Sequence, residues 1–548
     1  MKNTLLIISI ILFLFSCSGV EKKIEKDTAD KKERNYKNEL NQYFSTNYLS
    51  IVKSNIKDVK LDSIEWVHKF YKIVDHSTIW INDSIQLSDK GVALIEQLAN
   101  AKNYGLDTRM YKLNTLNELK KGIDTIQLKD KRYSIASELE ALLTYFYMQH
   151  GKHLNYGVLD SVNNVTTISR KKFKINLPDY LNNASKSDSI IEKLLDLQPK
   201  HAEYHNLQKG LEKFLSHSSL STDNVNVQNF RKDSLKAMQQ AKEALIIHQY
   251  LSDEENDTLY FNALIKFQAD HGLSPDGLIG KHTAIALSVS PYEYYKKIVA
   301  NLERWRWRED KPLDYVFVNI PSYKMQVYKD GKQKREHKVV VGNFKNQTPE
   351  IVDTLEYIIA YPYWNVPRKI SVKEILAKVQ KDSTYLARNN YELFDYSRNT
   401  IEPSSINWNE VNEDSFRYLV RQKGGRSNAL GLVKFIFPNK KAIYFHDTPS
   451  KSYFKREYRA YSHGCVRVDK ALDLAEYLLE TDKNKFTIDS VNEYIKKQKQ
   501  RPIALNTKLP VYIYYTTTSA DNFGNITFYN DIYKADNKLI SELAVSSN

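Results

Sequence analysis

Cysteine, glycine and proline are all scarce in this chain of 548 residues. The 2 cysteines exclude a disulfide framework and a cysteine-rich zinc scaffold. The 17 glycines and 14 prolines stand beside abundant Lys, Asn, Ile and Tyr, which indicates a compositional bias of codon origin. After the first twenty residues no stretch approaches eighteen consecutive apolar residues, so nothing there is predicted to span a membrane.

The rest of the composition indicates a folded chain with several domains. Hydrophobic residues make up 42% and aromatic residues 12%, which is enough to bury real cores and excludes a mainly disordered chain. The length predicts about three or four domains. The net charge of +14 is compatible with an anionic partner, such as nucleic acid, anionic lipid or an acidic polymer, and also with codon bias.

The first residues predict export. A basic start is followed by an apolar run from Leu5 to Phe15 and by small residues, a pattern too short to span a bilayer comfortably. Leu14-Phe15-Ser16-Cys17 resembles the lipobox of bacterial lipoproteins, which implies cleavage before Cys17 and a lipid anchor on it. Phe15 departs from the small or aliphatic residue of that motif, and an ordinary signal peptide is the alternative. We expect an envelope protein that faces the periplasm, with a charged tether over 18–44.

Residues 45–239 show helical periodicity and are predicted to form a scaffold domain. One helix is expected to open at Ser88 and to close near Gly105. A second is expected over Ser137–Gln149, with Gly151 as its stop. Neither carries reactive side chains.

A compact helical unit is predicted over 240–290. The string FQADHGLSPDGLIGKHT, which begins at Phe267, places FQ, GL, DG, IG and T at the spacings of the small peptidoglycan-binding domain, which this unit resembles. A generic helical hairpin with glycine caps is the alternative.

Strands dominate from residue 313 to about 535. Alternating segments flank Asp330-Gly331, which is a strong hairpin signal. The pattern becomes helical and charged over about 369–431, which predicts an insertion into a β-rich domain. Near the end, Pro510–Thr516 and Gly524–Tyr529 are expected to pair with each other.

Cys465 is the one cysteine left once Cys17 is assigned to the anchor. An unpaired cysteine in an exported chain suggests a reactive thiol, although many single cysteines are buried hydrophobic residues. Gly464 permits a turn beside the thiol, and the positive charge of Arg467 favours the thiolate. We therefore interpret Cys465 as a nucleophile.

A thiol nucleophile needs a base within hydrogen-bond reach. His446 ends a predicted strand upstream, and His463 lies two residues from Cys465; His446 is preferred, and the residue pattern alone leaves both open. Asp447 should point to the opposite face of a strand from His446 and cap the turn. A metal site made of the two histidines and Cys465 is the rival, but no pattern of four zinc ligands is present.

These motifs resemble a known family. S-H-G-C-V-R with an upstream H-D-T-P is similar to the catalytic motif of L,D-transpeptidases, which cross-link bacterial peptidoglycan. VNIPSYKMQVY, YPYWNVPRKI and GLVKFIFPN extend the similarity to the large multi-domain members. The resemblance implies a multi-domain α+β protein: a helical scaffold, a small helical peptidoglycan-binding domain, and a β-rich catalytic domain with a helical capping insertion.

The resemblance also implies a mechanism. Cys465 would attack the third residue of a donor tetrapeptide, D-alanine would leave, and a thioester would form, with His446 as the base held by a backbone carbonyl. The N–H groups of Gly464 and Cys465 would stabilise the oxyanion. The residues expected to line the site with them are Ser462, His463, Arg467 and Tyr444. No cofactor or metal is implied. The implied partners are peptidoglycan stem peptides and glycan, with the membrane reached through the lipid, and no nucleic acid.

Several alternatives remain open from the sequence. Ser452-Tyr453-Phe454-Lys455 matches the S-x-x-K of serine D,D-transpeptidases, but no K-[ST]-G accompanies it. Papain-like enzymes place Cys before His, the reverse of the order here. An L,D-carboxypeptidase would share the acyl-enzyme, and a non-catalytic peptidoglycan-binding lipoprotein would not need Cys465. The oligomeric state and the choice of membrane are not predicted.

Overall fold

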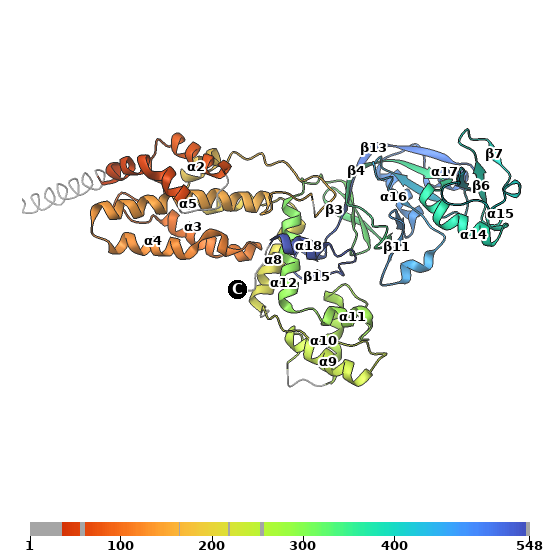
Figure 1. The fold of residues 1–548 in the computed structure, drawn as a ribbon, viewed down its shortest axis with the longest axis horizontal. Coiled ribbons are helices and arrows are strands. Elements are labelled where there is room, and N and C mark those ends of the chain that lie inside the picture. Colours follow the sequence, from red (N-terminus) through yellow and green to blue (C-terminus); the bar gives the residue numbers. More distant parts are fainter. Residues whose placement is uncertain (1–35, 55–60, 164, 218–219, 253–256, 544–548) are drawn as a thin grey trace, which may run out of the picture.

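The computed structural model describes residues 36–54, 61–163, 165–217, 220–252 and 257–543. The predicted export signal, Cys17 and residues 18–35 lie outside the described residues. A helical region stands at one end of an elongated molecule and a β-rich region at the other, with a small helical unit projecting between them (Figure 1). This is the expected multi-domain α+β architecture. No helix in the described ranges is both long enough and apolar enough to cross a bilayer.

The tether predicted for 18–44 is wrong over its last part. Residues 36–54 are helical, and Leu40 and Phe44 are fully buried in the core of the N-terminal region. Their four-residue spacing places both side chains on one helix face, and Tyr48 continues that face. The segment contains few apolar residues, but their helical spacing is sufficient to attach it to the core.

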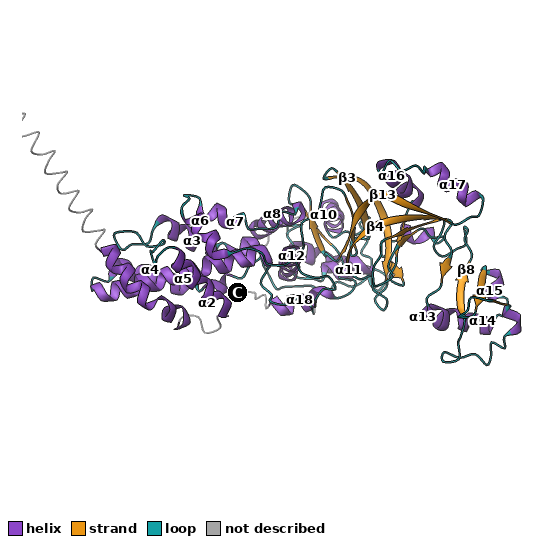
Figure 2. Ribbon diagram, turned by 90° about the horizontal axis from the view of Figure 1, so that it is seen from above, coloured by secondary structure: helices purple, strands orange, loops and turns teal. Residues whose placement is uncertain are grey.

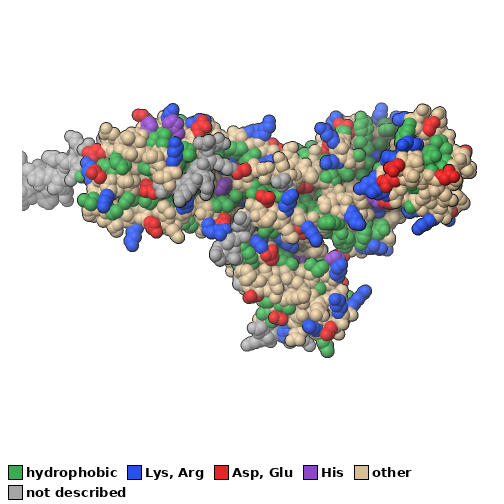
Figure 3. Space-filling model, in the orientation of Figure 1, with side chains coloured by type: hydrophobic (Ala, Val, Ile, Leu, Met, Phe, Trp, Pro, Cys, Tyr) green, Lys and Arg blue, Asp and Glu red, His purple; other side chains and the backbone are tan. Residues whose placement is uncertain are grey.

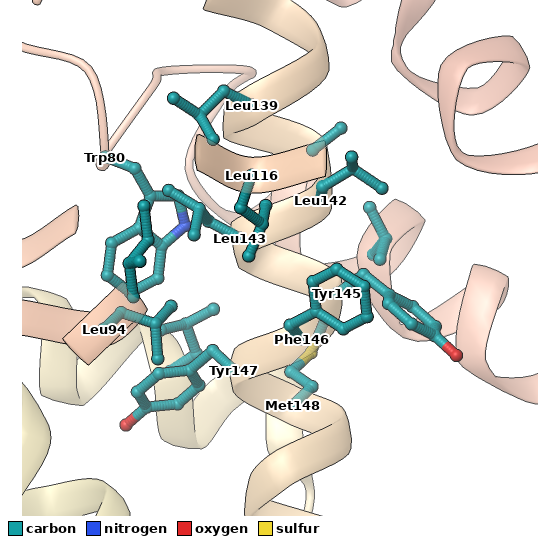
Figure 4. Packing of buried hydrophobic residues seen from close by; sticks show 14 of the residues in the cluster. Trp80, Leu94, Leu116, Leu139, Leu142, Leu143, Tyr145, Phe146, Tyr147 and Met148 are labelled. Carbon is teal, nitrogen blue, oxygen red and sulfur yellow. The ribbon is translucent and has the colours of Figure 1, made fainter. Parts of the chain in front are cut away.

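The N-terminal region packs around one long central helix (Figure 4). Ser88 caps the N-terminus of α3 by accepting a hydrogen bond from the Gly91 N–H, as the sequence predicts for a helix start. The helices of this region are α2 (Leu61–Ile73), α3 (Asp89–Ala99), α4 (Leu113–Thr125), α5 (Lys129–Tyr156), α6 (Leu177–Ser185) and α7 (Ile190–Leu195).

Gly151 does not end the central helix, contrary to the prediction. α5 continues through it to Tyr156 and stops at Gly157, whose φ of 91° takes the chain out of the helix. A Cβ on Gly151 would lie 2.8 Å from a methyl group of Leu197 and 3.3 Å from one of Leu194. The glycine therefore allows α7 and the residues after it to pack closely on α5, which sequence periodicity cannot distinguish from a helix stop.

A second bundle joins the helical region to the sheet. It contains α8 (Ala202–His217), α12 (Pro291–Arg306) and α18 (Ala535–Leu543), and α12 contacts both of the others. Arg304 pairs with Asp536 of α18 at 2.6 Å, and Arg308 pairs with Glu350, which precedes the sheet strand β4 (Ile351–Ala360), at 3.2 Å. The scaffold predicted for 45–239 is thus divided, because α8 belongs to the core of this junction.

The small helical unit contains α9 (Ser234–Ile247), α10 (Asp257–Asp270) and α11 (Lys281–Leu287). Its core already begins at Val225, before the expected boundary at 240. Gln268 organises the turn between α10 and α11: its Oε1 accepts from the Gly277 N–H at 2.8 Å, and its Nε2 donates to Asp276 at 3.0 Å. The FQ and DG elements of the motif are therefore partners in one buried network.

The β-rich region is a nine-stranded sheet in the order β11-β3-β12-β10-β9-β4-β13-β1-β2, and a further β2–β3 pairing closes it on itself. Asp330 and Gly331, at φ of 52° and 70°, form the predicted turn between β2 and β3. Helices α16 (Ala471–Thr481) and α17 (Ile488–Lys496) accompany the sheet. Its strands are β1 (Tyr315–Asn319), β2 (Lys324–Lys329), β3 (Lys332–Gly342), β4 (Ile351–Ala360), β9 (Val433–Ile436), β10 (Phe445–His446), β11 (Ala460–Ser462), β12 (Val466–Val468) and β13 (Arg501–Tyr514).

The predicted pairing of Pro510–Thr516 with Gly524–Tyr529 is wrong. The first segment belongs to β13, which lies inside the sheet between β4 and β1. The hairpin is shorter and pairs β14 (Thr518–Ala520) with β15 (Ile526–Phe528). Val511 and Ile513 are fully buried, and both edges of their strand are already paired, so no edge is left for the final hairpin.

The insertion between β4 and β9 lies at the far end of the molecule (Figures 1 and 2). It has its own apolar core and a four-stranded sheet in the order β5-β8-β6-β7, so it is mixed rather than purely helical. Its elements are β5 (Trp364–Asn365), α13 (Arg368–Ile370), the π-helical turn η3 (Ser371–Ile375), α14 (Leu376–Lys381), α15 (Tyr385–Arg388), β6 (Tyr391–Phe394), β7 (Thr400–Ile401) and β8 (Leu419–Gln422).

A buried carboxylate holds the N-terminal region together. Glu140 of α5 is fully buried and accepts hydrogen bonds from the backbone N–H groups of Ile79, Trp80 and Ile81 at 2.8–3.2 Å. The Tyr71 hydroxyl donates to it as well, at 2.9 Å. Burial raises the pKa of Glu140 to about 7 against these donors. One side chain thus satisfies three backbone donors of an irregular segment.

We expect Glu140→Ala to destabilise this region by about 3–5 kcal/mol, because each orphaned buried donor costs ~1–3 kcal/mol. Hydrogen exchange of the α5 amides measures the change without requiring the whole chain to unfold in one step. Glu96→Ala, an exposed change on α3, is the matched control. Equal protection of the α5 amides in both variants would contradict the role given to Glu140.

Candidate active site

The candidate residues come together on two neighbouring strands. β10 and β12 run parallel, with Phe445 opposite Val466 and His446 opposite Arg467. Phe445 and Val466 are buried in the core of the sheet. Because side chains alternate along a strand, the flanking residues point to the opposite face. That face carries Tyr444 and His446 from one strand and Cys465 and Arg467 from the other.

The thiol sits at the end of a tightly bonded loop. Gly464 has a φ of 116°, which a side chain would disfavour, and its carbonyl accepts from the Thr348 hydroxyl at 2.7 Å. Ser462 is 2% exposed; its hydroxyl donates to the Cys465 carbonyl at 2.6 Å and accepts from the Gly464 N–H at 3.1 Å. Ser462 therefore braces the loop, whereas a substrate-binding position was expected.

The N–H groups of Gly464 and Cys465, the two expected oxyanion donors, differ in whether they already have a hydrogen-bond partner. The Gly464 N–H is used by Ser462, so it is not free to bind an oxyanion in this conformation. For the Cys465 N–H, no hydrogen-bond partner is found among the described residues. Of the pair predicted from the sequence, the Cys465 N–H is the available donor here.

His446 is oriented by a backbone carbonyl. Its Nδ1 donates to the Asp447 carbonyl at 2.5 Å, which leaves Nε2 as the acceptor of the neutral ring. Burial, and then the charge of Arg467, lower the pKa of His446 to about 3, so the ring is neutral at physiological pH. The Asp447 carboxylate turns away: it accepts from the Leu432 N–H at 2.9 Å and pairs with Lys451. It is not the third member of a triad.

His463, the rival base, contacts the insertion. Its Nε2 lies 2.5 Å from the Glu374 carboxylate of η3. No hydrogen bond or ion pair joins it to Cys465 within the described ranges. Its partner on the insertion makes it a link between the catalytic loop and that subdomain.

Lys434 is a residue of this face that the sequence reasoning missed. It lies on β9 directly opposite His446, and its Nζ is 3.6 Å from the centre of the Tyr444 ring. It forms no ion pair with a carboxylate in the described part of the chain. The available signal was a lysine in the apolar run of Val433–Phe437, which indicates a special environment inside a buried sheet.

Burial and the neighbouring groups shift the pKa of the Cys465 thiol in opposite directions. Burial raises the pKa of the Cys465 thiol above its ordinary value. Hydrogen bonds from Tyr444 and the positive charges of Lys434 and Arg467 lower it. Burial also lowers the pKa of Lys434. The net effect is a raised pKa, so the resting group is the thiol, and the positive charges of Lys434 and Arg467 only partly offset its burial.

The described residues contain no group of three or more His, Cys, Asp or Glu side chains that could hold a metal ion. The chemistry that the arrangement supports is nucleophilic. A cysteine thiol, a neutral histidine held by a carbonyl, a backbone N–H donor and two cations are the parts that acyl transfer through sulfur requires.

Comparison with known proteins agrees with this chemistry. Residues 313–511 match the family described as the L,D-transpeptidase catalytic domain, and residues 65–211 match the one described as a scaffold domain. A protein of Haemophilus influenzae named "Putative L,D-transpeptidase" is 37% identical over 244 residues, which cover 44% of this chain and 49% of that protein. The match therefore spans about half the length of each.

We expect Lys434→Met to slow alkylation of Cys465 by iodoacetamide about tenfold at neutral pH, because loss of a nearby cation raises the pKa of the thiol. The pH profile of the alkylation rate should shift to higher pH. Lys434→Arg, which retains the charge, should keep most of the rate, and Lys440→Met, on an exposed turn before β10, should change nothing. An unshifted profile in Lys434→Met would contradict this electrostatic role.

Proposed function

Because residues 313–511 match the family described as the L,D-transpeptidase catalytic domain, we propose that the chain forms peptidoglycan cross-links through a thioester on Cys465. The observation that carries the proposal is the parallel pairing of β10 with β12. It sets Cys465 and His446 on one sheet face, with His446 held in a single tautomer by the Asp447 carbonyl.

The reaction begins with proton transfer from the Cys465 thiol to His446 Nε2. The thiolate attacks the carbonyl carbon of the third residue, a diamino acid, of a donor tetrapeptide. The bond to the fourth residue breaks, His446 returns its proton to the leaving amine, and D-alanine departs. The side-chain amine of a second stem then attacks the thioester, His446 takes the amine proton, and the Cys465 sulfur leaves.

The surroundings stabilise charge that develops during these steps. The Cys465 N–H donates to the oxyanion, and the Gly464 N–H joins it once Ser462 releases it. Lys434 and Arg467 stabilise the thiolate and attract stem carboxylates, and Tyr444 donates a hydrogen bond to the sulfur. The mechanism uses no metal or organic cofactor.

We place this activity in the cell envelope. The apolar run from Leu5 to Phe15, followed by Ser16-Cys17, supports export and a lipid anchor, with the folded body facing the periplasm. The net charge of +14 then suits an anionic wall polymer better than nucleic acid.

The test is conversion of disaccharide tetrapeptide by the purified full-length chain, followed by mass analysis. We expect a cross-linked dimer that has lost one D-alanine. Cys465→Ala should yield none, and His446→Gln should lower the rate by about 10²–10⁴-fold, which is the usual contribution of a general base.

Ser452→Ala is the matched control, because it removes the serine of the S-x-x-K match and is exposed in the 3₁₀ helix Lys451–Lys455. Full activity of this variant excludes the serine mechanism. Tripeptide monomer as the only product would establish the L,D-carboxypeptidase alternative in place of cross-linking. Unchanged tetrapeptide with the unaltered chain would overturn the enzymatic proposal in favour of a binding protein.

A further inference from the structure

A cavity of about 300 Å³ lies between the small helical unit and the catalytic sheet. The helical unit contributes the turn His271–Pro275 and His282. The catalytic region contributes the turn before β2, the connection Lys455–Arg459 and the residues after β15. Lys and Arg side chains are spread over this face of the molecule, and some of them lie near the place where the two bodies meet (Figure 3).

The two bodies are in close contact at this cavity. Gly272 has a φ of 62°, and a Cβ there would lie 2.9 Å from the Tyr529 ring. The rings of His271 and Phe528 stack with centres 5.2 Å apart. His282 stacks on Tyr458 at 5.8 Å. The walls are thus held by specific packing, and the cavity is a built feature of the fold.

The residues that line the cavity carry an excess of positive charge. Four cationic side chains, Lys338, Lys455, Arg456 and Arg459, face one carboxylate, that of Glu457. Within the described ranges neither Lys338, Lys455 nor Arg456 forms an ion pair. Positive charge without a protein counter-ion favours an anionic ligand.

The cavity wall also has unsatisfied acceptors. His271 is 5% exposed, and its Nδ1 donates to the Phe267 carbonyl at 2.6 Å, so Nε2 is left as an acceptor. Neither this Nε2 nor Oε1 of Glu457 has a hydrogen-bond partner in the described part of the chain. Both atoms are enclosed by the surrounding side chains, so they belong to the packed wall of the cavity and are not open to a ligand.

A ladder of rings and cations joins the cavity to the thiol. Arg467, two residues after Cys465, lies over Tyr453 at 5.9 Å. Tyr453 stacks on Tyr461 at 4.8 Å, and Arg456 covers both rings. Tyr461 meets Tyr458 edge-on at 5.5 Å, and Tyr458 meets His282 of the helical unit. Side-chain contacts of the segment 453–461 therefore run without a break from Arg467 to the helical unit.

We propose that this cavity binds a carboxylate-bearing stem peptide of the wall polymer, and that the ladder leads the same strand to Cys465. The ligand is an acidic glycopeptide whose carboxylates pair with the lysines and arginines of the lining. The inference rests on the proposed function, because peptidoglycan is the polymer that supplies such stems. Binding would belong to the helical unit and the catalytic sheet jointly.

The test is co-sedimentation of the full-length chain with purified peptidoglycan sacculi in the Cys465→Ala background, so that no chemistry consumes the polymer. Lys338→Glu with Lys455→Glu reverses two charges on different walls of the cavity. We expect binding to weaken about tenfold at 0.15 M salt, with a shallower salt dependence. Lys496→Glu with Lys499→Glu, at and just beyond the end of α17, makes the same change in net charge outside the cavity and should bind like the parent.

Equal binding by the cavity variant and the parent would overturn the inference. Equal loss in the cavity variant and the α17 variant would overturn it as well, because it would reveal a general attraction between a basic protein and an acidic polymer. Neither outcome depends on turnover. Failure of the unaltered chain to convert tetrapeptide, measured separately, bears on the proposed function alone.

Discussion

The arrangement of the whole molecule depends on the buried charges at the end of α12. Arg304, Arg306 and Arg308 alternate with two tryptophans and are at most 4% exposed. Each requires a carboxylate, because breaking a buried pair by removing one partner costs about 3–5 kcal/mol. The carboxylates come from different segments: Asp536 from α18, Glu303 from α12 itself, and Glu350 from the edge of the catalytic sheet.

The same charges connect α12 to the N-terminal region. Glu303 accepts hydrogen bonds from the Val158 N–H, just after α5, and from the Trp307 indole. Arg306 donates to the Tyr104 carbonyl. The first turns of α12 contact the small helical unit through the rings of Tyr294 and His271, 4.8 Å apart. One helix therefore orients the scaffold, the helical unit and the sheet together, and with them the walls of the cavity that faces the ladder.

Local signals in the sequence predicted much of this fold and failed where a feature depends on distant packing. The Ser88 cap and the Asp330-Gly331 turn involve neighbouring residues only, and both are present as expected. A glycine at position 151 is typical of a helix end. Its actual role is to leave room for Leu197, which is remote in the sequence. The final hairpin was misassigned because the pairing of β13 with β4 and β1 is a property of the whole sheet.

The same division applies to the site. His446 and Cys465 carry recognisable chemistry in short motifs, so both could be named as candidates from the sequence. Lys434 could not, because its place beside them follows from the register between β9 and β10, which no motif contains. Ser462 was assigned to substrate, whereas its hydroxyl bonds to the backbone on either side of the thiol loop.

The geometry of that loop is tied to the insertion between β4 and β9. Glu374 of η3 meets His463 directly, and Lys369 of α13 donates to Asn346 at 3.1 Å. Asn346 belongs to the 343–348 loop, whose Thr348 hydroxyl holds the Gly464 carbonyl. Lys369 and Glu374 lie five residues apart on one short helical segment, so that segment cannot leave its position without losing both contacts. Docking of the insertion and the conformation of the Gly464–Cys465 peptide are therefore coupled parts of one equilibrium.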